Sequence, residues 1–469
     1  MSPQTVMYRS EVPASAMTVY WWHARVGAFA RLTPPWERVE LVNHHGGVSN
    51  GAIAELRLKL GPIGIRWVAR HDDHIEGSRF SDTQIKGPFR HWKHLHRFDA
   101  ISPTVTILQD EIEYELPLGR IGRWIAGAST KQRLARMFAY RHEVTKRDLQ
   151  RHQTMLTQRS HRILISGASG LLGTVLSSFL STGGHKVVRL TRSGTRQEPG
   201  AIPWDPEHGV ADGSLLEGFD AVIHLAGENI AGGRWTASRK RKIRDSRVQG
   251  TRRLAEQLAM CRDKPSVLVS ASAVGYYGHQ GESELNESAK RGEGFLADVC
   301  EAWEQAADPA REAGIRVVHP RFGMILSPAG GALAKMLTPF SLGLGGPLGN
   351  GRQWWSWVAV DDAAAAITHA IDVQEVSGPM NVVAPNPVRN REFTRTLAAV
   401  LRRPAFLPAP AFGLRLLLGE MADELLLPSQ RVLPGVLDRT GFRFAYPTLD
   451  AALRHVLGRP DRDGQGGSD

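Results

Sequence analysis

The chain has 469 residues, which is enough for two or three domains. Hydrophobic residues make up 42% and charged residues 22%, and no apolar run approaches the roughly 18 residues that span a bilayer, so we expect a globular protein without a membrane partner. The net charge is +11, but acidic side chains are interspersed among the basic ones and no RNA- or DNA-binding motif is present, so we expect no nucleic acid partner.

The cysteines and the first residues of the chain bear on the compartment. Cys261 and Cys300 alone cannot build a disulfide framework or a thiolate metal site. The first ten residues contain no apolar signal core. We therefore expect a cytoplasmic protein.

Residues 1–157 are predicted to form an α+β domain. Alternating or β-branched runs between residues 5 and 116 indicate successive antiparallel strands, with an amphipathic helical stretch at 15–32. Apolar residues near helical spacing predict a long closing helix over about 129–152. This order, together with the stretch 87–98, resembles the helix-grip fold of the START and polyketide-cyclase-like proteins. The resemblance implies an apolar cavity that holds a hydrophobic ligand.

Three histidines of this domain, His91, His94 and His96, are candidate metal ligands. On a strand, His94 and His96 share one face while His91 lies on the other, and no Asp, Glu or Cys completes a set at ligand spacing. We therefore favour solvated or packing histidines and predict no metal site.

A polar stretch at 153–161 follows, so we expect a domain boundary near residue 158. Residues 163–173 then predict a buried strand, a tight turn and the start of a helix. The glycines of the turn follow the pattern G-x-x-G-x-x-G, which differs from the usual G-x-G-x-x-G. Such a turn brings backbone and a helix N-terminus close to a pyrophosphate, whereas an ordinary β–α turn is the alternative. The expected dinucleotide contacts are Gly167, Ser169, Gly170, Leu171 and Gly173.

The next strand, 185–191, ends about twenty residues beyond the glycines, where an NAD-selective site usually carries Asp or Glu. Thr191, Arg192 and Ser193 stand there instead. A cation and hydroxyls suit a 2′-phosphate, so we predict NADP as cofactor; a solvated arginine on a loop is the alternative.

A third strand, 221–227, completes the first half of a doubly wound parallel α/β sheet and adds Leu225, Ala226 and Gly227 to the expected cofactor contacts. The basic run 239–247 would indicate a nuclear-localisation or RNA-binding patch in isolation. Within a nucleotide-binding fold we interpret it as a helix that passes the cofactor, with Arg247 the first and Lys242 the second choice to reach a phosphate.

Further motifs in fixed order point to a family. They are Ile165-Ser-Gly-Ala-Ser-Gly-Leu-Leu-Gly, Ile223-His-Leu-Ala-Gly-Glu-Asn-Ile, Asp245-Ser-Arg, Ser270-Ala-Ser-Ala-Val-Gly-Tyr-Tyr-Gly, Trp303-Glu, Pro320-Arg-Phe-Gly-Met-Ile-Leu, Gly343-Leu-Gly-Gly-Pro-Leu-Gly-Asn-Gly-Arg-Gln and Ser356-Trp-Val-Ala-Val-Asp-Asp. Through them residues 162–458 resemble the extended short-chain dehydrogenase/reductase superfamily, and within it the atypical epimerase-like family of the YfcH type. The resemblance implies a Rossmann domain over 162–375, a small C-terminal cap over 376–458, Met324 beside the cofactor and a small-molecule substrate. Residues 459–469, rich in Asp and Gly, are expected to form a disordered tail.

The resemblance also implies a Ser-Tyr-Lys relay, in which Tyr is the general acid or base and Lys lowers its pKa. Ser272 matches the serine. Phe295 and Val299 stand where Tyr-x-x-x-Lys is expected, and neither carries a proton to give or a charge. The ordinary relay is therefore in doubt.

Three hypotheses follow for the proton. Tyr276 or Tyr277 supplies a phenol, Glu293 or Asp298 serves as a buried carboxyl acid, or no proton is transferred. The first two make the protein an NADP-binding oxidoreductase or epimerase-like enzyme. The third makes it a non-catalytic NADP-dependent sensor or a carrier of a hydrophobic ligand. No residue pattern specifies the substrate or the oligomeric state.

Overall fold

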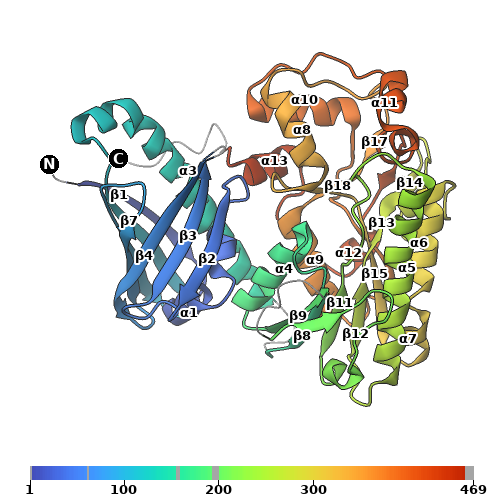
Figure 1. Ribbon diagram of the computed structural model, residues 1–469, viewed down its shortest axis with the longest axis horizontal. Coiled ribbons are helices and arrows are strands. Elements are labelled where there is room, and N and C mark those ends of the chain that lie inside the picture. Colours follow the sequence, from blue (N-terminus) through green and yellow to red (C-terminus); the bar gives the residue numbers. More distant parts are fainter. Residues whose placement is uncertain (1–2, 61–62, 155–158, 193–199, 460–469) are drawn as a thin grey trace. The chain divides into compact units, whose positions relative to one another are not determined.

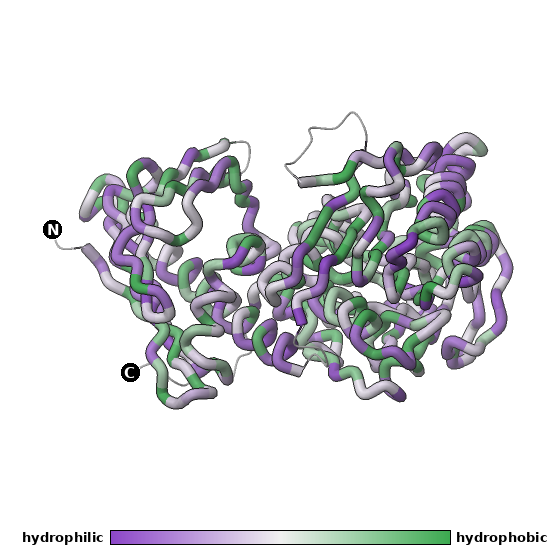
Figure 2. The backbone as a smooth tube through the Cα atoms, turned by 90° about the horizontal axis from the view of Figure 1, so that it is seen from below, coloured by the Kyte–Doolittle hydropathy of each residue, from purple (hydrophilic) through white to green (hydrophobic). Residues whose placement is uncertain are grey.

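The computed structural model describes residues 3–60, 63–154, 159–192 and 200–459. The chain divides into two compact units, one consisting mainly of Met1–Met155 and the other of Leu156–Leu180 with His185–Leu457. Each unit has buried hydrophobic clusters of its own, and apolar segments occur in both halves of the chain in Figure 2.

The first unit is a seven-stranded antiparallel sheet accompanied by helices (Figure 1), with strand order β1-β7-β6-β5-β4-β3-β2. Its strands are β1 (Gln4–Val12), β2 (Val39–His45), β3 (Ile53–Leu60), β4 (Ile63–Ile75), β5 (Arg79–Lys86), β6 (His91–Ser102) and β7 (Val105–Glu115), and its helices are α1 (Ala16–Ala24), α2 (Ala28–Leu32) and α3 (Gly119–Thr154).

Alternation along the strands gives this sheet one buried face. On β6, Trp92, His94, His96 and Phe98 are buried and the residues between them are more exposed. Helix α3 packs against β1 and β7 and buries Leu134, Phe138, Val144 and Leu149. An antiparallel sheet with a long closing helix is the helix-grip-like architecture that the sequence predicts.

Helix α3 is longer than the sequence pattern indicates. It begins at Gly119, ten residues before the predicted start near 129. In this added segment Ile121, Trp124 and Ile125 are exposed, so their spacing does not mark a buried face. The segment also contains Gly119, Gly122 and Gly127, and glycine is a weak helix former, so local propensity does not favour a helix there.

The second unit is built on a parallel sheet with the order β10-β9-β8-β11-β12-β15-β13, and β19 pairs with β15. The strands are β8 (Arg162–Ser166), β9 (Lys186–Arg192), β10 (Ile202–Trp204), β11 (Ala221–His224), β12 (Val267–Ser270), β13 (Ser272–Ala273), β15 (Arg316–Phe322) and β19 (Gly378–Val382). From β8 the chain proceeds to β9 on one side and later returns to β11 on the other. The strand order thus reverses between β8 and β11, which is where doubly wound folds bind ligands.

Helices surround this sheet and extend into the C-terminal part (Figure 1). They are α4 (Leu171–Thr182), α5 (Ala237–Met260), α6 (Phe295–Gln305), α7 (Asp308–Glu312), α8 (Gly331–Ser341), α9 (Val360–Asp372), α10 (Asn390–Leu401), α11 (Ala411–Leu418), α12 (Gly435–Arg439) and α13 (Leu449–Leu457). Short strands pair as β14 (Glu284–Leu285) with β21 (Arg431–Val432), β16 (Met324–Leu326) with β18 (Trp357–Ala359), and β17 (Trp354–Trp355) with β20 (Val388–Arg389). Among the described residues, no helix is both long and apolar enough to cross a membrane.

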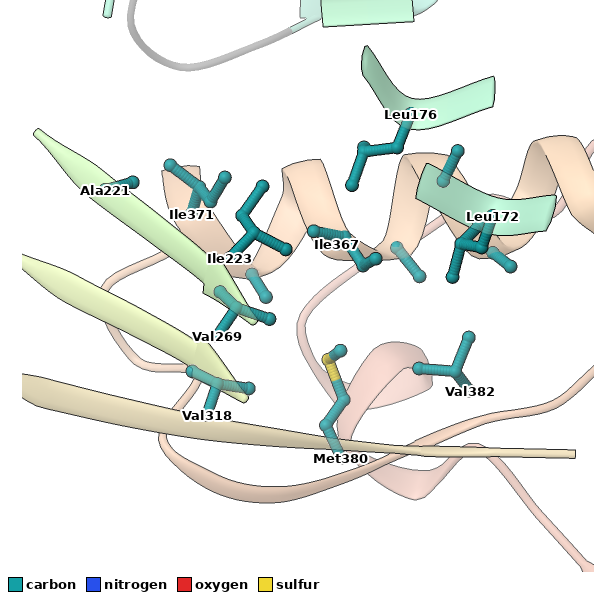
Figure 3. Close-up of a cluster of buried hydrophobic side chains, with 14 of the residues drawn as sticks. Leu172, Leu176, Ala221, Ile223, Val269, Val318, Ile367, Ile371, Met380 and Val382 are labelled. Carbon is teal, nitrogen blue, oxygen red and sulfur yellow. The ribbon is translucent and has the colours of Figure 1, made fainter. Parts of the chain in front are cut away.

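One large cluster of buried side chains joins the sheet to two of its helices (Figure 3). Leu172 and Leu176 of α4 and Ile367 of α9 pack against Ile223 of β11 and Val269 of β12. Helix α9 is rich in buried alanines, which let it approach the sheet closely. This packing fixes the ends of β8 and β11, where the candidate site lies.

Candidate functional site

The glycine turn joins β8 to α4 at the carboxyl edge of the sheet. Gly167 has φ of +70°, and a Cβ there would lie 2.7 Å from the carbonyl carbon of Leu225. A Cβ on Gly173 would lie 2.2 Å from the backbone oxygen of Gly167. Side chains are thus excluded at both positions, as the turn pattern predicts. Helix α4 begins at Leu171, so the N–H groups of its first turn are available to an anion, and Ser169 is exposed in the turn.

The segment after β11 meets this turn and a half-buried cation. A Cβ on Gly227 would lie 3.3 Å from Cζ of Arg247, which projects from α5. The Arg247 guanidinium donates a hydrogen bond of 3.0 Å to the Ile243 oxygen and lies 5.0 Å from the Trp303 ring centre, and burial lowers its pKa. The structure therefore brings Arg247 to the 225–227 segment, whereas Lys242 is exposed on the same helix.

The end of β9 carries the residues predicted for the 2′-phosphate. Thr191 is half-buried and Arg192 is exposed, and their backbones pair with Pro203 and Trp204 of β10. Ser193 lies outside the described residues. The positions of Thr191 and Arg192 are those at which a parallel sheet presents its carboxyl edge.

Met324 opens β16, and the segment that follows it reaches the glycine turn. The Met324 N–H donates a 2.9 Å hydrogen bond to the Ser356 oxygen, and its side chain is half-buried. A Cβ on Gly330 would lie 3.5 Å from Cδ1 of Leu171. The 324–330 segment thus lies beside the beginning of α4.

Ser272 is held by a buried ion pair. Its hydroxyl donates a 2.7 Å hydrogen bond to Oε1 of Glu304 on α6. The same carboxylate accepts two hydrogen bonds of 2.8 Å from Arg321 of β15, whose side chain is only 3% exposed. The Ser272 proton is therefore directed to Glu304, and no described residue donates a hydrogen bond to its oxygen, although the residue is only 2% exposed.

The two neighbouring tyrosines differ sharply. Tyr277 is fully buried, donates its hydroxyl proton to Oδ1 of Asn381 at 2.7 Å and accepts a 3.0 Å hydrogen bond from Arg321. Burial raises the pKa of Tyr277, and its hydroxyl already makes these two hydrogen bonds within the protein. Tyr276 is half-buried, its ring centre lies 3.5 Å from the Arg321 guanidinium carbon, and no described residue hydrogen-bonds its hydroxyl. Tyr276 is thus the phenol that remains available.

Helix α6 offers no proton donor where the relay's tyrosine and lysine are expected. Phe295 packs 5.2 Å from the Trp235 ring, and Val299 is 2% exposed. Glu424 accepts hydrogen bonds of 3.1 Å from the N–H groups of Phe295 and Leu296 and so caps the helix.

The two carboxyl groups considered as alternative acids lie in open positions. Glu293 and Asp298 are both exposed, and Asp298 forms a 2.7 Å ion pair with Arg291. Neither lies in the desolvated surroundings that a buried carboxyl acid requires.

Sequence reasoning missed the group that positions Ser272 and the tyrosines. Glu304, Arg321 and Asn381 come from three separate elements and meet only in the fold. Two of them lie within motifs that mark the family resemblance, and a charged residue in the apolar run of β15 is the signal that could have found Arg321.

Comparisons with known proteins agree with this architecture. Residues 163–383 match the family model of the NAD dependent epimerase/dehydratase family, residues 12–138 that of polyketide cyclase / dehydrase and lipid transport, and residues 409–456 a domain of unknown function, DUF1731. The epimerase family protein Mb2239 of Mycobacterium bovis is 41% identical over 298 residues, which cover 64% of this chain and 98% of that protein. The chain belongs to the epimerase family. The predicted resemblance, with a polyketide-cyclase-like N-terminal domain, is confirmed.

Two solved structures extend the epimerase-family match. A nucleoside-diphosphate sugar epimerase from Corynebacterium glutamicum is 36% identical with a TM-score of 0.81, and the match covers 97% of this chain and 90% of that one. The human epimerase family protein SDR39U1 (isoform 2), solved with NADPH, is 35% identical with a TM-score of 0.58, and covers 63% of this chain and 98% of its own. The first of these epimerase-family structures therefore matches both units.

Proposed function

We propose that the second unit binds NADP at the carboxyl edge of its sheet and that the protein is an oxidoreductase or epimerase-like enzyme of the extended short-chain dehydrogenase/reductase type. The observation that carries this proposal is that Gly167 and Gly173, positions closed to side chains, meet the 225–227 segment, beside which lies the half-buried cation of Arg247. The human relative solved with NADPH supports the same choice of cofactor.

The residues present fit a dinucleotide phosphate. In this proposal, the glycine turn and the first N–H groups of α4 bind the pyrophosphate, and Arg247 adds a cation beside Gly227. Arg192 and Thr191 bind the 2′-phosphate. When bound, NADP supplies hydride transfer. The proposed cofactor contacts are Gly167, Ser169, Gly170, Leu171, Gly173, Thr191, Arg192, Ser193, Leu225, Ala226, Gly227, Arg247 and Met324.

Ser272 and Tyr276 then have separate roles at the substrate oxygen. Ser272 accepts a hydrogen bond from a substrate hydroxyl, because its own proton is directed to Glu304. Tyr276 exchanges the proton, with its ring held against the Arg321 cation. Since the Corynebacterium relative is described as a nucleoside-diphosphate sugar epimerase, sugar nucleotides are the first substrates to test.

The cofactor assignment is tested by titrating the full chain with NADPH and NADH. Arg192→Ala should remove a charged hydrogen bond of about 1.5–3 kcal/mol, which lowers NADPH affinity about ten- to a hundredfold and leaves NADH affinity nearly unchanged. Arg252→Ala, an exposed arginine of α5, is the matched control and should change neither affinity. Equal losses for both cofactors in Arg192→Ala would refute the 2′-phosphate assignment.

Turnover is tested by following NADPH consumption or sugar epimerisation with the cofactor bound. Tyr276→Phe keeps the ring on Arg321 and should lower kcat about 100-fold or more without changing NADPH affinity. Ser272→Ala should also lower kcat. Ser288 is exposed, and Ser288→Ala serves as the control. Full activity in Tyr276→Phe would exclude Tyr276 as the proton donor.

A second candidate function is favoured by Phe295 and Val299. Because helix α6 carries no phenol and no amine at these positions, the protein could bind NADP without turnover, as a sensor or as a carrier of a hydrophobic ligand in the first unit. Tight NADPH binding with no consumption across sugar nucleotides and simple carbonyl compounds would favour this function.

A further inference from the structure

The inner face of the first unit's sheet carries a cluster of histidines and carboxylates. His94 and His96 lie two residues apart on β6 and share its buried face. Asp82 of β5 pairs with His94 across the sheet, and Asp110 of β7 pairs with His96. The expectation that no acidic side chain completes the histidine set was wrong, because both carboxylates come from neighbouring strands.

The contacts within this cluster are short. His94 lies between the carboxylates, with Nδ1 3.1 Å from Oδ2 of Asp82 and Nε2 2.9 Å from Oδ1 of Asp110. The same Asp110 oxygen is 2.7 Å from Nδ1 of His96. On its other side Asp110 is held by Nε2 of His142 on α3, at 2.8 Å.

Three members of this cluster are almost fully buried. His94 is 3%, His96 7% and Asp110 2% exposed, and the ring of Phe80 lies 4.4 Å from that of His96. Carboxylates in such surroundings need positive partners or a metal ion. Nδ1 of His96 lies 2.7 Å from Oδ1 of Asp110, which leaves Nε2 as the ring nitrogen without a hydrogen-bond partner among the described residues.

We propose that Asp82, His94 and His96 bind a divalent transition metal ion, with Zn²⁺ the preferred ion. One ligand atom from each residue lies within 4.8 Å of the other two, and ligands of a tetrahedral Zn²⁺ lie about 3.4 Å apart, so small side-chain rotations suffice. Two imidazoles and one carboxylate are an established donor set for such ions.

Asp110 completes the arrangement as an outer carboxylate. Histidines that bind a metal commonly donate their other ring N–H to a carboxylate, which fixes the orientation of the ring. Asp110 contacts both His94 and His96 in this way, and His142 in turn holds Asp110. Nε2 of His96, which no described residue hydrogen-bonds, is then the atom that binds the metal.

Three protein ligands leave a coordination position for an oxygen donor, since tetrahedral Zn²⁺ takes four ligands. The site therefore suits a ligand of the first unit that carries a carbonyl, carboxylate or hydroxyl group. This inference concerns the first unit alone and does not depend on the proposed NADP chemistry.

The test uses the full chain without an affinity tag that binds metals. After EDTA treatment, the protein is titrated with Zn²⁺ and with Co²⁺, and metal content, melting temperature and the visible Co²⁺ absorption are measured. About one equivalent should bind, raise the melting temperature and produce Co²⁺ bands in the visible range.

Matched variants decide whether the proposed ligands are responsible. His96→Gln and Asp82→Asn should lose stoichiometric binding and the Co²⁺ bands, and Asp110→Asn should bind about 10- to 100-fold more weakly. His91→Gln, on the opposite face of the same strand, should bind as the wild type does. If His96→Gln fails to fold, Asp82→Asn carries the test, because 20% of that side chain is exposed. No binding by the wild type, or unchanged binding in Asp82→Asn and His96→Gln, would show a purely structural hydrogen-bond network and overturn the proposal.

Discussion

At the residue scale, His224 at the end of β11 links stability to pH. Its Nδ1 lies 2.6 Å from the Ser166 hydroxyl, its ring packs edge-on 5.6 Å from Trp204, and burial lowers its pKa to about 4. In the unfolded chain the imidazole titrates near 6.5. The stability from the neutral form is thus complete above pH 6.5 and is lost as the pH falls from 6.5 through 4, because the unfolded chain takes up the proton first.

His224→Gln should therefore show a weaker acid dependence. Between pH 6.5 and 5 the wild type should lose about 2 kcal/mol of the free energy of unfolding through this residue, which urea titrations at the two pH values measure. His208→Gln, an exposed histidine, should keep the wild-type dependence. Equal slopes in His224→Gln and wild type would contradict the assignment.

At the element scale, the glycine turn requires that α4 start directly beside β8. Gly173→Ala would place a methyl group 2.2 Å from the Gly167 oxygen, a backbone atom that can move only if the helix moves. We expect a loss of about 1–3 kcal/mol in stability and weaker NADPH binding. Gly213→Ala is the control, since no atom lies within 4 Å of its added Cβ. Wild-type melting and NADPH affinity in Gly173→Ala would disprove the close approach.

A lysine at position 299 of α6, where the ordinary relay has one, should destabilise the protein. Val299 is 2% exposed, so Val299→Lys would bury an unpaired charge and should cost about 3–5 kcal/mol. Asp298→Lys, one residue earlier and exposed, should cost much less. Thermal unfolding of both variants measures the difference, and equal melting temperatures would argue against a buried position 299.

Local patterns and long-range contacts were not equally predictable. The glycine turn and strand β8 follow from neighbouring residues, because turn dihedrals and a buried apolar run are local properties. The start of α3 at Gly119 does not follow from neighbouring residues, because the apolar residues of its first turns are exposed. The pairing of Asp82 with His94 does not either, because it depends on the register of two strands. The bond between Tyr277 and Asn381 joins residues 104 positions apart, so no spacing argument could reveal it.

At the scale of the whole molecule, the two units contain separate buried clusters and should respond separately to ligands. Saturating NADPH, at about 100 times its dissociation constant, should stabilise the second unit by about 2.7 kcal/mol and leave the first unchanged. Differential scanning calorimetry with and without NADPH measures this as a shift of one of two transitions. A single transition that moves as a whole would show that the units unfold together.

The presence of both units in one chain also has a consequence for stoichiometry. The first unit is present at one copy per second unit, at every expression level and every dilution of the protein. Two separate proteins would lose this ratio and would have to find each other by diffusion. The fusion therefore keeps the ratio of the two units at one to one, whatever the abundance of the protein.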